Sequence, residues 1–578
     1  MDIGSAVVTR VNGPVVDVSF GEGLAMLDLV HVGPQRLPGE VIALAGTTAT
    51  VQVYEYTGGL KPGDVVLGTG GPLAVELGPG LLGGVFDGVL RPLRSAGVRI
   101  EPGSATGTLS GERVWRFIPA ARAGEQRGAG AVLGTVRETA AIEHRVLVPP
   151  GAGGLLDWIA PEGEYRVGET IARAGGAELG LSQRWPVRRP RPSRARLPAP
   201  EPLVTGQRVL DLLFPVARGS TAAIPGGFGT GKTVALQQIA KWCDAAVIVY
   251  VGCGERGNEL ADVLEEFEAL EDPRTGQPLL DRTLLIANTS NMPVMAREAS
   301  IYTGVTVAEY YRDMGYDTVV IADSTSRWAE ALRELASRTD ELPAEEGYPA
   351  GLSSALADFY ERAGRVQTLA GEIASVSILG AVSPPGGDLT EPVTSHTRRF
   401  VRSVWSLDRD LAYARHYPAV SWRDSSSRDA QQLATWQAEH GDPGWGARRG
   451  RALRLLTDAD RIESVAQLVG ADSLPGQERV TLRSARLLRE AVLQQSAVLD
   501  NDQYTSPAKQ RALLTLVLDL HDRLIGLLER GIAVAELDAL DLSAVLRARY
   551  DTPPDGSDEV EHIGRELIGA LDGVGARP

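Results

Sequence analysis

The sequence predicts a multidomain α/β protein, and three observations support this fold class. The N-terminal part contains short alternating runs typical of strands, the middle alternates apolar runs with helical stretches, and the C-terminal part is helical. The 578 residues suffice for three or four domains, and 43% hydrophobic residues are ample for their cores. We expect an N-terminal β-barrel (residues 1–75), a β-rich insertion (110–185), a central domain with a mainly parallel sheet (200–435) and a C-terminal helical bundle (436–578).

The N-terminal segment is expected to form a small barrel. Strands are predicted over Val7–Val11 and Val15–Val18, on either side of Asn12-Gly13, a favoured two-residue hairpin turn. The run Ala49–Tyr54 alternates in the same way, and Gly, Pro and Asp separate such runs. Closure into a barrel is the natural arrangement for these strands, because it removes open sheet edges.

The insertion is glycine-rich and strand-like, with strands predicted at Val132–Val136 and His144–Val148. The segment Trp185–Pro198 after it is basic and rich in proline. A phosphate- or RNA-binding arm is one interpretation of that segment. A semi-rigid linker is favoured, because proline prevents regular pairing and the segment has no stacking aromatic residue beyond Trp185.

The central region has the alternation expected of a parallel sheet. Its strand candidates are continuously apolar rather than alternating, which is typical of central strands covered on both faces. These candidates are Ala245–Val251, Thr283–Ala287, Thr318–Ala322 and Val376–Leu379.

The C-terminal region after about residue 440 is predicted to be helical. Ser506-Pro507 provides an N-cap followed by proline at the first helical position, and Gly531 provides a stop. The apolar face of this helix is formed by Leu513, Val517, Leu520, Leu524 and Leu528.

Composition narrows the functional classes. A net charge of −16 argues against a general nucleic-acid binder, which would present a basic face. The two cysteines, Cys243 and Cys253, cannot form a disulfide framework and fit a reducing cytosol, and the seven histidines lack metal-ligand spacing. No apolar run approaches the roughly 18 residues that span a bilayer, and no secretory signal is visible. We therefore expect a soluble protein that can still dock onto a membrane complex.

Residues 226–233 carry the most specific motif, the G-x-x-x-x-G-K-[ST] loop that wraps nucleotide phosphates. Its members are Gly226, Gly227, Phe228, Gly229, Thr230, Gly231, Lys232 and Thr233. A strand at Thr221–Ile224 and a helix at Val234–Lys241 are predicted around it, as in a RecA-like P-loop NTPase domain. Only four of the 58 basic residues are lysine, so Lys232 indicates a need for a compact ammonium between phosphates. Thr233 is expected to bind Mg²⁺ through its hydroxyl.

Two acids and an arginine complete a candidate catalytic set. Asp323 follows the apolar run Thr318–Ala322 and is expected to organise Mg²⁺ through a water. Glu255 follows the strand after the P-loop helix and is placed to activate the attacking water, whereas a surface pair with Arg256 is the alternative. Arg256 is expected to neutralise phosphate charge. Glu259 is interpreted as an N-cap or structural acid.

Several long motifs resemble the catalytic A subunit of V-type and archaeal A-type rotary ATPases. The resemblance runs nearly end to end, with Phe86–Gly88 and Gln494-Gln495 also fitting. Residues 110–185 match the β-rich insertion that separates this subunit from its F-type counterpart. The motifs are Gly206–Ala217, Gly226–Thr233, Gly252–Glu259, Asn288–Val294, Ala322–Glu330, Pro343–Pro349 and Gly380–Asp388.

The resemblance implies a site that binds ATP or ADP with Mg²⁺. It implies phosphate and metal roles for Lys232, Thr233 and Asp323, water activation by Glu255 and phosphate neutralisation by Arg256. It also assigns Arg327 to the γ-phosphate, a role that the local pattern does not indicate. Tyr348 and Tyr417 are candidate adenine-side aromatics, and either could equally serve packing.

The resemblance further implies a hexameric head of three such subunits alternating with three non-catalytic B-type subunits, which supply an arginine finger. A central shaft, a peripheral stalk and a membrane ion-translocating sector are the other implied partners, and the chain would lie at the cytoplasmic face of the membrane. The choice between H⁺ and Na⁺, and between synthesis and hydrolysis, stays open.

The sequence departs from the family at three places. Val498 stands where an aromatic is usual, Ser421–Ser427 differs from the usual segment, and Thr230 replaces a cysteine of eukaryotic relatives.

Three alternative functions are an export ATPase, an RNA translocase and a silent nucleotide-binding subunit. An export ATPase would be shorter, and an RNA translocase would need basic pore loops. A silent nucleotide-binding subunit would be free to lose Lys232, Glu255 and Asp323.

Overall fold

The structure is a computed structural model that describes residues 6–21, 23–93, 107–272, 275–338, 342–470 and 473–574. The chain forms two compact units. The first comprises residues 1–198, 245–382 and 390–400, and the second comprises residues 199–244, 383–389 and 401–578. Among the residues of the described ranges, no helix is long and apolar enough to cross a membrane.

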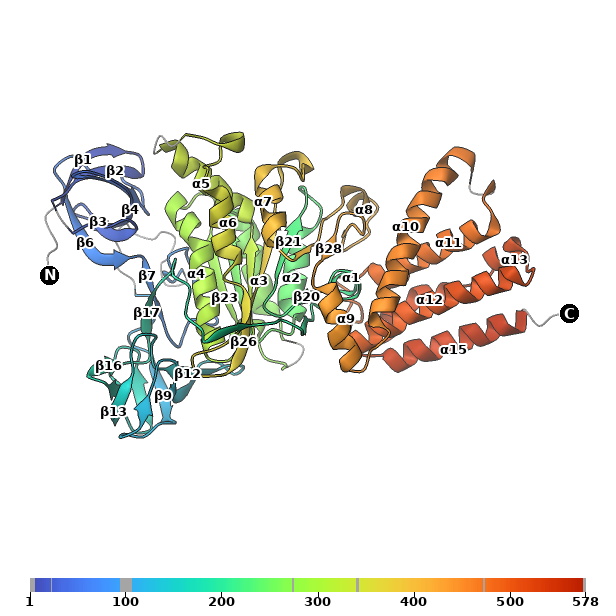
Figure 1. Ribbon diagram of the computed structural model, residues 1–578, viewed down its shortest axis with the longest axis horizontal. Helices are drawn as coiled ribbons and strands as arrows, with labels where there is room; N and C mark the ends of the chain where they lie inside the picture. The colour runs from blue at the N-terminus through green and yellow to red at the C-terminus, as the bar shows by residue number, and fades with distance from the viewer. Residues whose placement is uncertain are drawn as a thin grey trace. The chain divides into compact units, whose positions relative to one another are not determined.

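The first unit begins with the predicted closed β-barrel, in the strand order β1-β2-β5-β4-β3-β6 (Figure 1). The strands are β1 (Ala6–Asn12), β2 (Val15–Ser19), β3 (Asp28–Val32), β4 (Leu37–Ala45), β5 (Thr48–Val53) and β6 (Val65–Pro72). Asn12 pairs with Val15, so the hairpin turn is Gly13-Pro14, one residue later than predicted. Gly13 takes a left-handed φ of 58°, and Pro14 has no N–H to offer the ladder. Alternate valines such as Val16, Val18 and Val51 fill the interior.

The insertion is a pair of four-stranded antiparallel sheets. One has the order β12-β11-β9-β14, with β9 (Val114–Pro119), β11 (Val132–Arg137), β12 (Glu143–Leu147) and β14 (Gly163–Arg166). The other has the order β10-β13-β15-β16, with β10 (Gln126–Arg127), β13 (Gly154–Ile159), β15 (Ala172–Ala174) and β16 (Ala177–Leu179). The two strands predicted from sequence are β11 and β12. The barrel and the insertion are also linked by β7 (Ala74–Leu77), which pairs with β17 (Gln183–Pro186).

The segment Trp185–Pro198 is more ordered than a linker. Within it, β18 (Ala195–Leu197) pairs with β25 (Gly364–Gln367), so proline does not prevent pairing there. Two of its arginines are held by acids: Arg191 Nε donates to Asp313 at 2.7 Å, and Arg188 bonds to both Glu40 and Glu298. The prediction of a semi-rigid linker was therefore wrong, because ion pairs hold the segment against the rest of its own unit.

The central sheet of the first unit is parallel, in the order β26-β24-β22-β23-β8. Its strands are β8 (Val85–Phe86), β22 (Val247–Cys253), β23 (Thr283–Asn288), β24 (Thr318–Asp323) and β26 (Ile373–Val382), with β25 antiparallel at β26. All residues of β22 and β24 are buried, as their continuous apolarity predicts. The helices of this unit are α3 (Gly257–Ala269), α4 (Val294–Asp313), α5 (Thr325–Arg338), α6 (Leu352–Tyr360) and α7 (Pro392–Phe400). The long helix α4 packs on β22, β23 and β24, beside α5 (Figure 1).

The second unit contains the P-loop and the helical C-terminal part. In it β21 (Thr221–Pro225) pairs in parallel with β27 (Ser403–Val404), which pairs with β28 (Ser426–Ser427), and β19 (Pro202–Leu203) pairs with β20 (Val216–Ala217). Its first helices are α1 (Arg208–Leu213), α2 (Lys232–Trp242) and α8 (Arg409–Tyr413). The C-terminal helices are α9 (Ala430–Glu439), α10 (Trp445–Val469), α11 (Gly476–Leu487), α12 (Pro507–Glu529), α13 (Val534–Asp538), α14 (Ser543–Asp551) and α15 (Ser557–Val574), with a π-helical turn at Leu488–Leu493.

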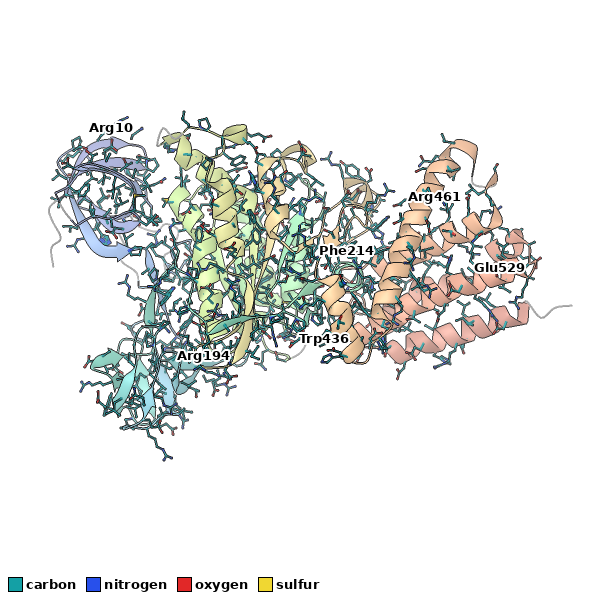
Figure 2. The ribbon with its side chains drawn as sticks, in the orientation of Figure 1. Arg10, Arg194, Phe214, Trp436, Arg461 and Glu529 are labelled. Atoms are coloured by element: carbon teal, nitrogen blue, oxygen red, sulfur yellow. The ribbon has the colours of Figure 1, made fainter. Side chains whose placement is uncertain are left out.

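The predicted helix limits hold at α12. Ser506 caps its N-terminus by accepting a hydrogen bond from the backbone N–H of Lys509, and Gly531 follows its end at a φ of 90°. Figure 2 labels Glu529 at that end of α12, and Trp436 and Arg461 on α9 and α10. Four of the five predicted face residues are buried: Leu513, Val517, Leu520 and Leu524.

Candidate active site

The P-loop joins β21 to α2 and has the backbone that a phosphate cradle needs. Gly229 and Gly231 take φ values of 78° and 85°, which side chains other than glycine rarely adopt. A Cβ at Gly226 would lie 2.8 Å from Leu407 Cβ and 2.8 Å from Thr230 Oγ1, so no larger residue fits there. These three glycines let the chain turn tightly into the helix.

Lys232 folds back into the loop. Its Nζ donates to the carbonyl oxygens of Gly226 at 2.5 Å and Gly227 at 3.0 Å, and the buried Thr230 hydroxyl donates to Gly227 at 2.8 Å. The first turn of α2 contains no acidic residue of its own, so the helix contributes no carboxylate to the positive end of its dipole. An ammonium, a turn of backbone N–H groups and a helix N-terminus together fit an anion such as a phosphate. Phe228, at the tip of the loop, is 89% exposed.

A pocket of about 430 Å³ lies beside the P-loop, within the second unit. Its lining is Gln207, Gly231, Val234, Ala235, Gln238, Arg415, Tyr417, Pro418, Gln494, Gln495, Ser496, Ala497, Val498 and Arg549. The Tyr417 ring lies 3.4 Å from the position of a Cβ at Gly231, so this predicted aromatic does flank the loop. Val498, the departure noted in the sequence, also lines the pocket and is 84% exposed. A cavity that combines apolar side chains with amide and guanidinium groups, next to a P-loop, is suited to a nucleotide base.

The predicted acids lie at the carboxyl ends of the parallel strands of the first unit. In the register of β22 with β24, Gly252 is opposite Asp323, so the loop carrying Glu255 begins beside that aspartate. Asp323 is buried and accepts a hydrogen bond from Tyr250 Oη at 3.1 Å. The carboxyl edge of such a sheet is where ligands of open α/β folds bind.

Glu255 is half-buried, and its surroundings favour the protonated form. Burial, the charge of Asp323 and the hydrogen bond and charge of Glu259 together raise the pKa of Glu255 to about 7, and Arg327 opposes the rise. A carboxyl that ionises near neutral pH is matched to proton transfer from water.

Arg327, near the start of α5, lies against the Glu255 loop. A Cβ at Gly254 would come within 2.6 Å of Arg327 Cβ, and Gly254 has a φ of 73°. The Arg327 guanidinium bonds to both carboxylate oxygens of Glu330 at 2.8 and 2.9 Å, and its side chain is 47% exposed. Arg256 is exposed at the N-cap of α3. The structure thus gathers Glu255, Asp323 and Arg327 at one edge of the first unit.

Tyr348 differs from Tyr417 in its setting. Tyr348 belongs to the first unit, where its ring is buried beneath the Arg333 guanidinium at 5.1 Å. Tyr417 lines the pocket of the second unit. Both adenine-side assignments stay predictions.

Three residues at these sites were not predicted from the sequence. Arg297 is buried, donates to the Ser290 carbonyl at 2.8 Å, and packs beside the Gly254 position. Its charge did not single it out in the sequence, because α4 carries other charged residues that are also buried, such as Glu298 and Glu309. Tyr250, inside an apolar strand, and Arg549, over 300 residues from the P-loop, gave no local signal of their contacts.

Comparison with known proteins gives four consecutive family matches. They are the nucleotide-binding domain of the ATP synthase alpha/beta family (residues 206–427), its beta-barrel domain (8–70), its barrel-sandwich domain (106–188), and the C-terminal domain of V and A type ATP synthase (434–533). These matches and the observed architecture confirm the predicted fold class, including the insertion.

Relatives of full length are about half identical to this chain. The V-type ATP synthase alpha chain of Nitrosococcus oceani is 54% identical over 93% of both chains. The A subunit of the A-type ATP synthase of Methanopyrus kandleri is 49% identical over 97% of both, and that of Hyperthermus butylicus is 48% identical over 98% of this chain and 96% of its own. The chain therefore belongs to the ATP synthase alpha/beta family, among the V-type alpha chains and A-type A subunits.

Proposed function

We propose that this chain is the catalytic subunit of a V/A-type rotary ATPase, coupling ATP hydrolysis or synthesis to transport of H⁺ or Na⁺ across a membrane. Its family supports the binding of ATP or ADP and the ATP synthase activity. The observation that favours a catalytic over a silent nucleotide-binding subunit is the Glu255 carboxyl, whose pKa is raised to about 7 at the strand edge that also carries Asp323.

The proposed roles follow from the chemistry of each side chain. Lys232 and the backbone N–H groups of the P-loop bind the phosphates. Glu255 accepts the proton of the attacking water, and Arg256 and Arg327 neutralise charge on the phosphates. Tyr348 and Tyr417 face the adenine.

Mg²⁺ is the proposed metal, held by the Thr233 hydroxyl and, through a water, by Asp323. Thr233 stands in the first turn of α2, and the Asp323 carboxylate is already oriented by Tyr250. Oxygen donors of this kind suit Mg²⁺, which usually keeps several waters and substrate phosphates as its other ligands. When bound, the ion offsets phosphate charge.

The relatives are ATP synthase subunits, so this chain works within a complex of subunits. We propose that three copies alternate with three non-catalytic B-type subunits, each supplying an arginine finger. The proposed complex also contains a central shaft, a peripheral stalk and a membrane sector that selects the ion, with this chain at the cytoplasmic face.

The test compares the purified chain with the chain assembled with its B-type partner. An arginine finger is worth about 10³–10⁵ in rate, so Mg²⁺-dependent ATP hydrolysis should rise by a large factor on assembly. Vigorous turnover by the isolated chain would contradict the proposed partner-supplied arginine. Absence of turnover in the complete assembly would contradict the catalytic role itself.

A further inference from the structure

The far wall of the base pocket, Gln494–Val498, is a stretch of backbone outside regular secondary structure. The π-helical turn ends at Leu493, and residues 494–496 enter neither helix nor strand. Backbone groups in such a segment need partners other than a helix or sheet ladder. The position of this wall is therefore set by the side chains that bond to it.

A buried aspartate holds one part of the wall. Asp502 Oδ2 accepts from the backbone N–H of Ser496 at 2.8 Å, and Asp502 Oδ1 lies 2.7 Å from Arg208 Nη2. Both charged side chains are fully buried. Arg208 also donates to the carbonyl oxygens of Val492 at 2.6 Å and Gln494 at 2.5 Å. The wall is thus fixed from behind by an internal ion pair.

A second guanidinium reaches the same carbonyl from a distant helix. Arg549, on α14, donates from Nη1 to the Gln494 carbonyl at 2.6 Å, and its Nε lies 3.9 Å from Asp502 Oδ2. Unlike the enclosed Arg208, Arg549 itself lines the pocket, with 14% of its side chain exposed. Arg549 lies beyond residue 533, where the match to the C-terminal family domain ends.

Helix α14 is in turn tied to the segment that carries Asp502. Lys509 Nζ donates to the carbonyls of Arg549 at 2.8 Å and Thr552 at 2.9 Å, at the C-terminal end of α14. Asn501 Nδ2 donates to the Tyr550 carbonyl at 3.1 Å. Because Lys509 holds the backbone carbonyl of Arg549 and the guanidinium bonds to the Gln494 carbonyl, the guanidinium has a defined place at the wall.

We propose that Arg549 is a positioning residue for the base of the bound nucleotide: by holding the Gln494 carbonyl it sets the place of the Gln494–Val498 wall. The inference rests on the proposed function, because only a nucleotide has both a base and phosphates. On this proposal Arg549 contributes to affinity for the base, and the P-loop binds the phosphates.

The test measures, on the full chain, dissociation constants for ATP and for inorganic tripolyphosphate, which has phosphates but no base. Arg549→Gln keeps the polar character but removes the charged fork, and Arg549→Lys keeps the charge and one donor. Arg547→Gln is the matched control, since Arg547 is on the same helix with an exposed side chain paired to Asp551 at 3.7 Å.

Loss of a hydrogen bond from a charged donor should raise the dissociation constant of Arg549→Gln for ATP about tenfold. Its constant for tripolyphosphate should stay within about twofold of the parent. Arg549→Lys should lie between parent and Arg549→Gln, and Arg547→Gln should match the parent for both ligands.

Three results would overturn the proposal: unchanged ATP binding in Arg549→Gln, equal losses for ATP and tripolyphosphate, or an effect of the same size in Arg547→Gln. Thermal denaturation checks folding, and if Arg549→Gln is unfolded, the comparison rests on Arg549→Lys. A parent chain that binds neither ligand would instead refute the proposed function, which distinguishes the two failures.

Discussion

Replacing Glu255 by Gln tests the catalytic assignment and its electrostatic basis together. The amide has nearly the same size but neither charge nor basicity. Lys232 and its carbonyl partners lie on the P-loop and are untouched by this change. Glu255→Gln should therefore still bind ATP, while turnover in the assembled complex should fall by roughly 10²–10⁴, the contribution of a general base.

The pH dependence follows from the raised pKa of Glu255, from an ordinary value of 4.5 to about 7. The carboxylate is the form that accepts a proton, so kcat/KM of the parent should fall about tenfold per pH unit below pH 7. The neutral form of Glu255 is more favoured in the folded chain than in the unfolded chain. Ionisation of Glu255 therefore destabilises the fold, an effect that is absent below pH 4.5 and complete above pH 7. Glu255→Gln removes this effect and should stabilise the chain at pH 8 relative to pH 5 by up to about 3 kcal/mol.

The assay is kcat/KM for ATP from pH 5.5 to 8.5 (roughly one unit and a half either side of the Glu255 pKa), with denaturant midpoints at pH 5 and pH 8. Glu265→Gln is the matched control, because Glu265 is exposed on the adjacent helix α3. Glu259→Gln should move the acidic limb to lower pH, since Glu259 raises the pKa of Glu255. A Glu255→Gln enzyme that keeps the same acidic limb, or turns over within a few-fold of the parent, would refute the reasoning.

Three further changes have defined outcomes. Lys232→Arg should reduce ATPase activity nearly as much as Lys232→Ala, because the planar guanidinium cannot replace an ammonium folded onto two loop carbonyls. Lys61→Arg, on the exposed barrel surface, is the control, and near-normal activity of Lys232→Arg would contradict the prediction. Gly254→Ala should lower both thermal stability and activity, because residue 254 has a left-handed φ and the new Cβ would lie 2.6 Å from Arg327 Cβ. Unchanged kinetics would show that activity does not depend on the position of Arg327. Burial lowers the pKa of His144 from 6.5 to about 3, so the contribution of neutral His144 to the free energy of unfolding is complete above pH 6.5 and is lost as the pH falls toward 3. His144→Gln should flatten this pH dependence in acid titrations, and an unchanged slope would show that other groups cause it.

Much of the fold was predictable because its signals are local. The continuous apolarity of β22 and β24 indicated buried parallel strands, and Ser506, Pro507 and Gly531 marked the two ends of α12. The P-loop was evident from its glycines and lysine. The hairpin turn was misplaced by one residue, since Asn-Gly competed with Gly-Pro and proline's missing N–H decided the register.

The segment Trp185–Pro198 shows where local reasoning failed. Its prolines favoured a linker, but the partners that order it, Glu40, Glu298 and Asp313, lie elsewhere in the chain. Composition cannot reveal an ion pair whose acid is more than a hundred residues away.

The sequence alone determined the family, the order of the structural modules and the P-loop motif, because strand period, helix caps and glycine conformations depend on neighbours along the chain. Tertiary structure decided the raised pKa of Glu255 and the wall of the pocket beside the P-loop. The first depends on burial and on the nearby Asp323 charge, and the second joins residues 231, 417, 494 and 549. Desolvation and electrostatic interactions act through space, so they are determined only when packing brings distant residues together.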